Sequence, residues 1–244
     1  MSRSLSFALS LVGAVGSAAE LAPISATTQQ CIVVVTDSWT SSTATARCFE
    51  RKNNSGWQET GRPIPVLLGR NGLAWGRGEM NHRRWPGPIK REGDDKAPAG
   101  VFKLGTAFGY AKDPVPTRLT YLPLTNNVVA VDDPKSRYYN QLIDKKKVRD
   151  PDWRSAENMI LADGRYRWGI WVRHNEPRAA GAGSCIFLHV WKNDSTLTSG
   201  CTAMSKSSMV RLLGWLDPAR DPLLIQLPRS IYSEVGPAWG LPAW

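Results

Sequence analysis

Large apolar side chains alternate with other residues in several short segments of this chain. In residues 165–173 every second position is large and apolar, as at Tyr166, Trp168, Ile170 and Val172. A period of two predicts a half-buried β-strand. Similar runs, rich in β-branched or aromatic residues and bounded by Gly, Pro, Asn or Asp, occur at residues 32–35, 64–68, 101–104, 128–131, 185–191 and 223–227. The pattern predicts a mainly β fold.

Helical spacing of apolar residues is rarer. It is clearest at residues 205–216, where Met209, Leu212, Leu213 and Leu216 recur at helical intervals, and weaker at residues 136–147. No internal repeat or Pro-, Gly- or Ser-rich linker divides the chain. We therefore expect one domain over residues 28–235, followed by a short C-terminal tail at residues 236–244.

The first 19 residues have the composition of an export signal. Arg3 is followed by an apolar stretch from Leu5 to Gly16 and by the small residues Ser17-Ala18-Ala19. The stretch is shorter than the roughly 20 residues that a spanning helix needs. We expect cleavage near Glu20, no stable membrane insertion afterwards, and a periplasmic or cell-wall location.

The net charge is +10, and removal of Arg3 leaves +9. Such a charge favours anionic partners, which for an exported protein are anionic polymers of the envelope. Basic residues are scattered apart from Lys145-Lys146-Lys147, so the sequence contains no nucleic-acid-binding motif, and we expect no nucleic-acid partner.

Four cysteines do not make a disulfide scaffold in a chain of this length. Cys31 and Cys48 nevertheless flank a turn near Trp39, and the segments CIVVV and ATARC have the pattern of a hairpin. If the two cysteines lie opposite each other, an oxidising compartment permits a bridge. The sequence leaves bridge and free thiols open.

The candidate chemistry lies between residues 185 and 204. On the strand predicted there, His189 shares one face with Cys185, Phe187 and Trp191. A loop containing Gly200 then brings Cys201 to the start of the predicted helix, where the helix dipole would favour a thiolate. An imidazole within reach can take the thiol proton and return it to a leaving amine.

The other histidines, His82 and His174, also precede Cys201, which excludes papain-like order, with cysteine before histidine. The histidine spacings do not suggest a zinc site, and the chemistry requires no metal or cofactor. On these residues alone, a core histidine and a buried thiol remain a full alternative. Cys185, four residues from His189, is better explained as a buried thiol than as a second nucleophile.

Two segments resemble the L,D-transpeptidase catalytic domain family. Thr198-Ser199-Gly200-Cys201, twelve residues after His189, is similar to the family's Ser/Thr-x-Gly-Cys signature, and residues 90–102, KREGDDKAPAGVF, are similar to its Gly-Asp…Thr-Pro-x-Gly-x-Phe segment. The likeness spans roughly residues 60–216. It implies a β-sandwich with a few short helices, one of them after the cysteine. It also implies acylation of Cys201, His189 as base, and an oxyanion hole from N–H groups near Gly200 and Cys201, supported by Ser199 and Thr198.

The chain departs from the family pattern at four points. Ser199 replaces a common second histidine, Val190 a glycine and Ala203 an Arg or Asn, and the loop before Cys201 is short. The form Gly-Cys-x-Ala-Met is similar to a branch that includes hydrolases of wall peptides. Attack on a peptidoglycan stem-peptide amide, followed by transfer to an amine, is the leading prediction. An L,D-carboxypeptidase or wall amidase and a non-catalytic wall-binding module are the alternatives.

Two further groups have weaker claims as site residues. Arg173, His174 and Asn175 end one predicted strand and either bind substrate or form a solvated strand end. The run Asp132-Asp133-Pro134 either orients an amine or makes a turn.

Overall fold

The computed structural model describes residues 24–52, 55–80, 85–111 and 115–244. The proposed export signal at residues 1–19 and His82 lie outside this part. The elements, in chain order, are β1 (Gln30–Thr36), β2 (Thr43–Glu50), β3 (Gln58–Leu67), β4 (Leu73–Trp75), β5 (Ala97–Gly109), β6 (Tyr121–Pro123), β7 (Val128–Val131), β8 (Gln141–Asp144), η3 (Lys145–Lys147), β9 (Ala156–Asn158), β10 (Trp168–Val172), β11 (Phe187–Val190), β12 (Thr202–Met204), α1 (Lys206–Trp215), η4 (Pro218–Arg220), β13 (Leu223–Pro228) and α2 (Arg229–Trp239).

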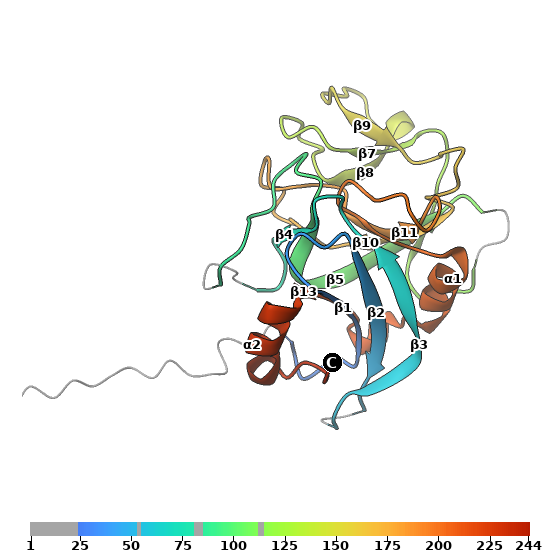
Figure 1. Ribbon diagram of the computed structural model, residues 1–244. Coiled ribbons are helices and arrows are strands. Elements are labelled where there is room, and N and C mark those ends of the chain that lie inside the picture. Colours follow the sequence, from blue (N-terminus) through green and yellow to red (C-terminus); the bar gives the residue numbers. More distant parts are fainter. Residues whose placement is uncertain (1–23, 53–54, 81–84, 112–114) are drawn as a thin grey trace, which may run out of the picture.

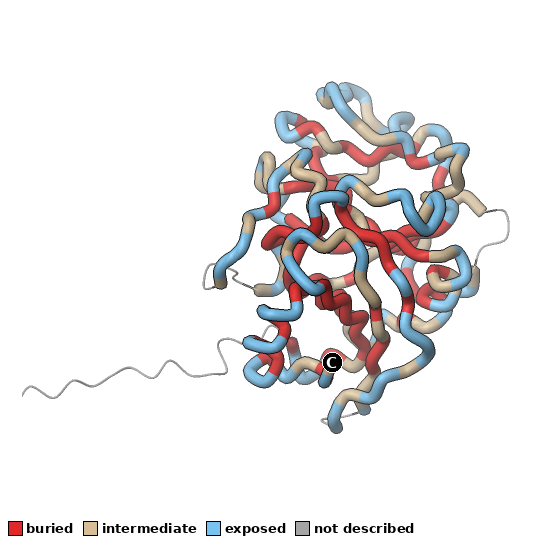
Figure 2. Tube along the Cα trace, in the orientation of Figure 1, coloured by how far each residue is buried: buried red, intermediate tan, exposed pale blue. Residues whose placement is uncertain are grey.

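The main sheet closes on itself through the long strand β5. Its strands follow the order β10, β11, β12, β3, β2, β1, β13, β5, β4. The first half of β5 pairs with β13, and the second half pairs with β10 (Figure 1). The buried interior strands appear in Figure 2 as a continuous red core. The prediction of a mainly β sandwich with few helices is confirmed.

A second sheet of three short strands, β8, β7 and β9, covers one face of the main sheet (Figure 1). We call these strands and their connections, residues 128–158, the cap. A small core that includes Val128, Met159, Phe108 and Phe187 packs between the cap and β5, β10 and β11. The cap therefore lies on the face of β11 that carries Phe187.

Alternation on β11 follows the pattern read from the sequence. Ile186, Leu188 and Val190 belong to the main core, and Cys185 and Phe187 belong to the core under the cap. Every second side chain of a strand points to the same face. His189 therefore lies on the cap side.

The helix predicted at residues 205–216 forms as α1, but the helix predicted at residues 136–147 is wrong. That segment contains a turn, β8 and η3. Asn140 has a positive φ of 58° and uses its amide in long-range hydrogen bonds, so the helical pattern is interrupted there. Tertiary contacts outweigh a weak local preference.

The C-terminal residues belong to the domain and do not form a tail. The expected boundary at residue 235 falls inside α2, which ends at Trp239. Tyr232 Oη donates a hydrogen bond to Pro242 O, and Trp239 and Trp244 pack on the core. Within the described residues, no helix combines the length and apolar character needed to cross a bilayer.

The predicted hairpin of β1 and β2 is present, but its register separates the two cysteines. Cys31 pairs with Phe49, and Cys48 pairs with Ile32. A one-residue offset places the two side chains on opposite faces. Both are free thiols, so the structure favours the second of the two alternatives that the sequence left open.

Candidate active site

Cys201 lies at the start of a strand rather than at a helix terminus. Residues 202–204 form β12, which pairs with β11 and β3. The helix begins only at Lys206, and Ser205 caps it by accepting a hydrogen bond from Ser208 N. The sequence analysis predicted that the helix dipole stabilises the Cys201 thiolate. This prediction is wrong, because the helix begins five residues after Cys201.

The Cys201 thiol is held by backbone groups of β11 and of the residues before it. Its Sγ accepts a hydrogen bond from Phe187 N at 3.3 Å and lies 3.6 Å from Cys185 O. Burial raises the pKa of Cys201 to about 12, and the nearby Glu157 carboxylate also raises it, whereas the Phe187 N–H lowers it. At neutral pH the resting residue is therefore a thiol, contrary to the thiolate expected from the sequence.

His189 is a buried, neutral base on the adjacent strand. Its side chain is 4% exposed, and burial lowers its pKa to about 4. Nδ1 lies 2.8 Å from Val190 O, and because a carbonyl can only accept, Nδ1 carries the proton. Nε2 is thus the proton acceptor, and the Tyr166 ring packs edge-on against the imidazole at 5.2 Å between ring centres.

The two candidate catalytic residues face one cleft. His189 pairs with Ala203, so Cys201, two residues earlier, lies on the same face of the adjoining strand. Both line a cleft of about 460 Å³. Among the described residues no direct hydrogen bond joins imidazole and thiol, and such bonds often form fully only with substrate bound.

Thr198 and Gly200 fix the loop that precedes Cys201, the candidate nucleophile. Thr198 Oγ1 donates a hydrogen bond to Cys201 O at 2.7 Å and accepts one from Gly200 N at 3.1 Å. Gly200 has φ of 152°, and an added Cβ would lie 3.1 Å from Lys96 O. A residue with a side chain would strain this turn.

This geometry bears on the role expected of the loop. The Gly200 N–H donates a hydrogen bond to Thr198 Oγ1 in this conformation, and its expected part in an oxyanion hole stays a prediction. Ser199 is exposed at the mouth of the cleft. A contribution of the Cys201 N–H to an oxyanion hole remains a prediction.

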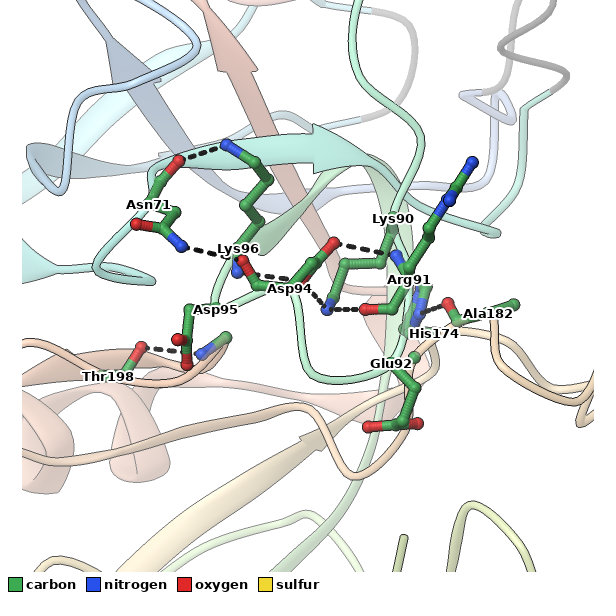
Figure 3. A network of polar contacts seen from close by, with 12 residues as sticks. Asn71, Lys90, Arg91, Glu92, Asp94, Asp95, Lys96, His174, Ala182 and Thr198 are labelled. Atoms are coloured by element: carbon green, nitrogen blue, oxygen red, sulfur yellow. Dashed lines mark hydrogen bonds and ion pairs between the residues drawn. The ribbon is translucent and has the colours of Figure 1, made fainter. Parts of the chain in front are cut away.

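The second sequence motif forms a rigid turn beside the cleft (Figure 3). Asp94 accepts hydrogen bonds from the buried Lys90 Nζ at 2.5 Å, from Arg91 N at 2.8 Å and from Lys96 N at 2.9 Å. Its carboxylate therefore organises the backbone and does not face substrate.

Residues 70 and 71 connect this turn to the catalytic loop. Asn71 N donates to Asp95 O at 3.0 Å, and Arg70 N donates to Thr198 O at 2.9 Å. Figure 3 shows Thr198 and Asp95 on either side of this connection. The two motifs, about 100 residues apart in sequence, thus support one another.

Arg173, His174 and Asn175 do not line the cleft that contains Cys201. His174 is buried, accepts a hydrogen bond from Arg77 N and contacts Ala182 O, and burial lowers its pKa to about 4. Asn175 is buried and bonds neighbouring loop carbonyls, and Arg173 pairs with Glu176 at 2.6 Å on the surface. His174 and Asn175 therefore support the loop, and substrate binding by any of these three residues stays a prediction.

Three site residues come from segments without a recognisable motif. Tyr166 precedes β10, Glu157 lies on β9, and Asp132 follows β7. Tyr166 Oη donates to Glu157 Oε1 at 2.7 Å, and all three line the cleft. The sequence signalled Asp132 only as half of an ambiguous pair and gave no sign of Glu157.

A comparison with protein-family models matches most of the chain. The family model described as the L,D-transpeptidase catalytic domain (YkuD) matches residues 42–225, which run from β2 into β13 and include every residue that lines the cleft. Among curated proteins, none matches this sequence.

Proposed function

Because the chain belongs to the L,D-transpeptidase catalytic domain family, whose members are cysteine-dependent peptidoglycan enzymes, we propose that Cys201 is acylated by a stem-peptide amide. The acyl group then passes to an amine, which makes the protein an L,D-transpeptidase. The observation that carries this proposal is the shared cleft, in which Cys201 and the neutral His189 face the same side of adjoining strands.

The protonation states favour a general-base mechanism. As Sγ attacks the amide carbon, His189 Nε2 removes the thiol proton, so no free thiolate has to exist beforehand. The tetrahedral species collapses with transfer of this proton to the leaving amine, and a thioester on Cys201 remains. An incoming amine attacks the thioester and gives its proton to His189. The tetrahedral species then collapses to the new amide and a Cys201 thiolate, which takes this proton from His189.

Water is the alternative acceptor. Ala203 pairs with His189 in the β11–β12 register and is 1% exposed, so it brings no polar group to that position. Transfer to an amine requires contacts that hold a second peptide long enough to exclude water. An L,D-carboxypeptidase or wall amidase is therefore the second candidate.

The cellular setting is part of the same proposal. The sequence of residues 1–19 supports export to the periplasm or wall, and stem peptides of peptidoglycan are the substrate. The charge of +10 supports an additional attraction to anionic envelope polymers.

Defined muropeptides test both the nucleophile and the acceptor. Intact mass of the wild-type protein with a tetrapeptide donor should show an adduct on Cys201, which Cys201→Ala removes and His189→Ala slows at least 100-fold. Rising amine acceptor should then increase cross-linked product at the expense of hydrolysis. Wholly hydrolytic product at high acceptor would identify a hydrolase, and the absence of any adduct would support a non-catalytic binding module.

A further inference from the structure

Three carboxylates line the cleft that contains Cys201. Glu92, Asp132 and Glu157 all line it together with Cys201, and we call them the carboxylate wall. All three raise the pKa of the buried Cys185 thiol, after burial itself, so they converge on one region. Glu92 and Glu157 each accept one hydrogen bond from a tyrosine hydroxyl, from Tyr139 and Tyr166 respectively.

Asp132 differs sharply from its neighbour Asp133. Asp133 accepts hydrogen bonds from Lys135 N at 2.9 Å and Arg154 N at 2.8 Å, so turn formation explains it. Asp132 Oδ1 is buried and has no hydrogen-bond partner in the described part of the chain. Its oxygen therefore has a desolvation cost that the folded protein alone does not offset.

Cations near the wall are already paired elsewhere. Arg70 pairs with Asp95 at 3.8 Å, Lys90 with Asp94 at 2.5 Å and Arg165 with Asp163 at 2.6 Å. Lys192, which also lines the cleft, is exposed and lies near Asp163. Across the described residues, none of the three wall carboxylates takes part in a salt bridge.

A neutral acceptor completes this region. Ser184 is 8% exposed and lines the cleft, and its hydroxyl oxygen is buried close to the Tyr139 hydroxyl and the Cys185 thiol, without a hydrogen bond of normal geometry to any described residue. It is adjacent in sequence to Cys185, around which the carboxylates gather. Unpaired oxygens of Asp132 and Ser184, together with neighbouring Glu157, match the three N–H donors of a primary ammonium group.

We propose that the carboxylate wall binds a primary ammonium group carried by the peptide substrate, with Asp132 as the main specificity-determining residue. This inference rests on the proposed function, because it concerns what enters the cleft beside Cys201. An alkyl ammonium group remains protonated at neutral pH, so it supplies the positive charge with which the wall carboxylates can pair. The ammonium belongs either to a side chain of the acyl donor or to the amine acceptor before it loses its proton.

Binding to a Cys201→Ala protein tests the donor without any turnover. The probes are a synthetic stem tetrapeptide with lysine at its third position and the same peptide acetylated on Nε. Calorimetry should give at least fivefold tighter binding of the free amine. Asp132→Asn should weaken binding of the free amine about tenfold and leave the acetylated peptide unchanged.

Asp133→Asn is the matched control. It changes the adjacent carboxylate, removes one turn hydrogen bond and should lower the melting temperature while preserving discrimination between the two peptides. Asp132→Asn should keep or raise the melting temperature, because it relieves an unpaired, crowded charge. If Asp132→Asn lowers the melting temperature and weakens binding of both peptides equally, Asp132 has a structural role and the inference is overturned.

The acceptor arm uses proteins that retain Cys201. If both tetrapeptides bind equally, but Asp132→Asn lowers the ratio of amine transfer to hydrolysis at least fivefold, the wall serves the acceptor amine. No effect in either arm, or no peptide binding together with unchanged partitioning, refutes an ammonium site. Acylation of Cys201 in the wild-type protein, followed by intact mass, decides the proposed function separately.

Discussion

Asn140 is the side chain through which we expect the cap to hold the catalytic strand in place. It is 5% exposed and precedes β8. Its Nδ2 donates to His174 O and Asn175 O, each at 2.9 Å, and its Oδ1 accepts from Cys185 N at 2.9 Å. Asn140→Ala removes all three hydrogen bonds.

The three partners of Asn140 are not affected equally. Asn175 O also accepts a hydrogen bond from Arg178 N at 2.8 Å and keeps it. His174 O and Cys185 N lose the bonds described here, and each buried polar group left unpaired costs about 1–3 kcal/mol. Alanine at a φ of 58° adds about 1 kcal/mol of backbone strain. We expect Asn140→Ala to lower the free energy of unfolding by about 3–7 kcal/mol.

Urea denaturation of three variants separates these contributions. Asn140→Gly loses the same hydrogen bonds without the strain at positive φ, so it should be about 1 kcal/mol more stable than Asn140→Ala. Asn158→Ala, at an exposed strand position, is the control and should change stability by less than about 0.5 kcal/mol.

Asn140→Ala should also reduce acylation of Cys201, because the backbone N–H of Cys185, next to the thiol, loses its hydrogen bond to Asn140. Acylation is measured at a temperature where the variant remains folded by circular dichroism. A variant within 1 kcal/mol of the wild type, or one that is acylated at the wild-type rate, would refute this account of the cap.

Three other predictions follow from the site and from the buried thiols. Thr198→Val should slow acylation at least tenfold by releasing the loop before Cys201, and Thr198→Ser, which retains the hydroxyl, should restore most of the rate. Burial depresses the pKa of both His174 and His189 from 6.5 to about 4. Between these two values the unfolded chain binds protons that the folded protein does not, so the free energy of unfolding is highest above pH 6.5 and falls as the pH drops toward 4. Urea titrations should therefore show a loss of about 2 kcal/mol per histidine between pH 8 and pH 5, whereas a flat profile would contradict neutral burial. Alkylation of the unfolded, unreduced protein should modify both Cys31 and Cys48, and a linked peptide pair would disprove the register of β1 and β2.

Local patterns were sufficient to predict much of the framework. Alternation placed His189 on the face opposite Ile186, Leu188 and Val190, and the helical spacing after residue 205 predicted α1. These features depend on the period of the backbone, which the order of residues determines directly. The motif around Gly200 and Cys201 predicted a loop before Cys201, but it did not predict the strand that follows.

The electrostatic state of the site depended on the tertiary structure. Nothing local distinguishes Asp132 from Asp133, or signals that Glu157 lies near Cys201, because both relations depend on how the cap packs on β11. The register of β1 with β2 likewise decided that Cys31 and Cys48 face apart. Burial set the pKa of Cys201 and of His189, and burial is a property of contacts between segments distant in sequence. The sequence by itself determined which residues are the candidates for the chemistry, whereas the packing of cap on sheet decided their protonation and their neighbours.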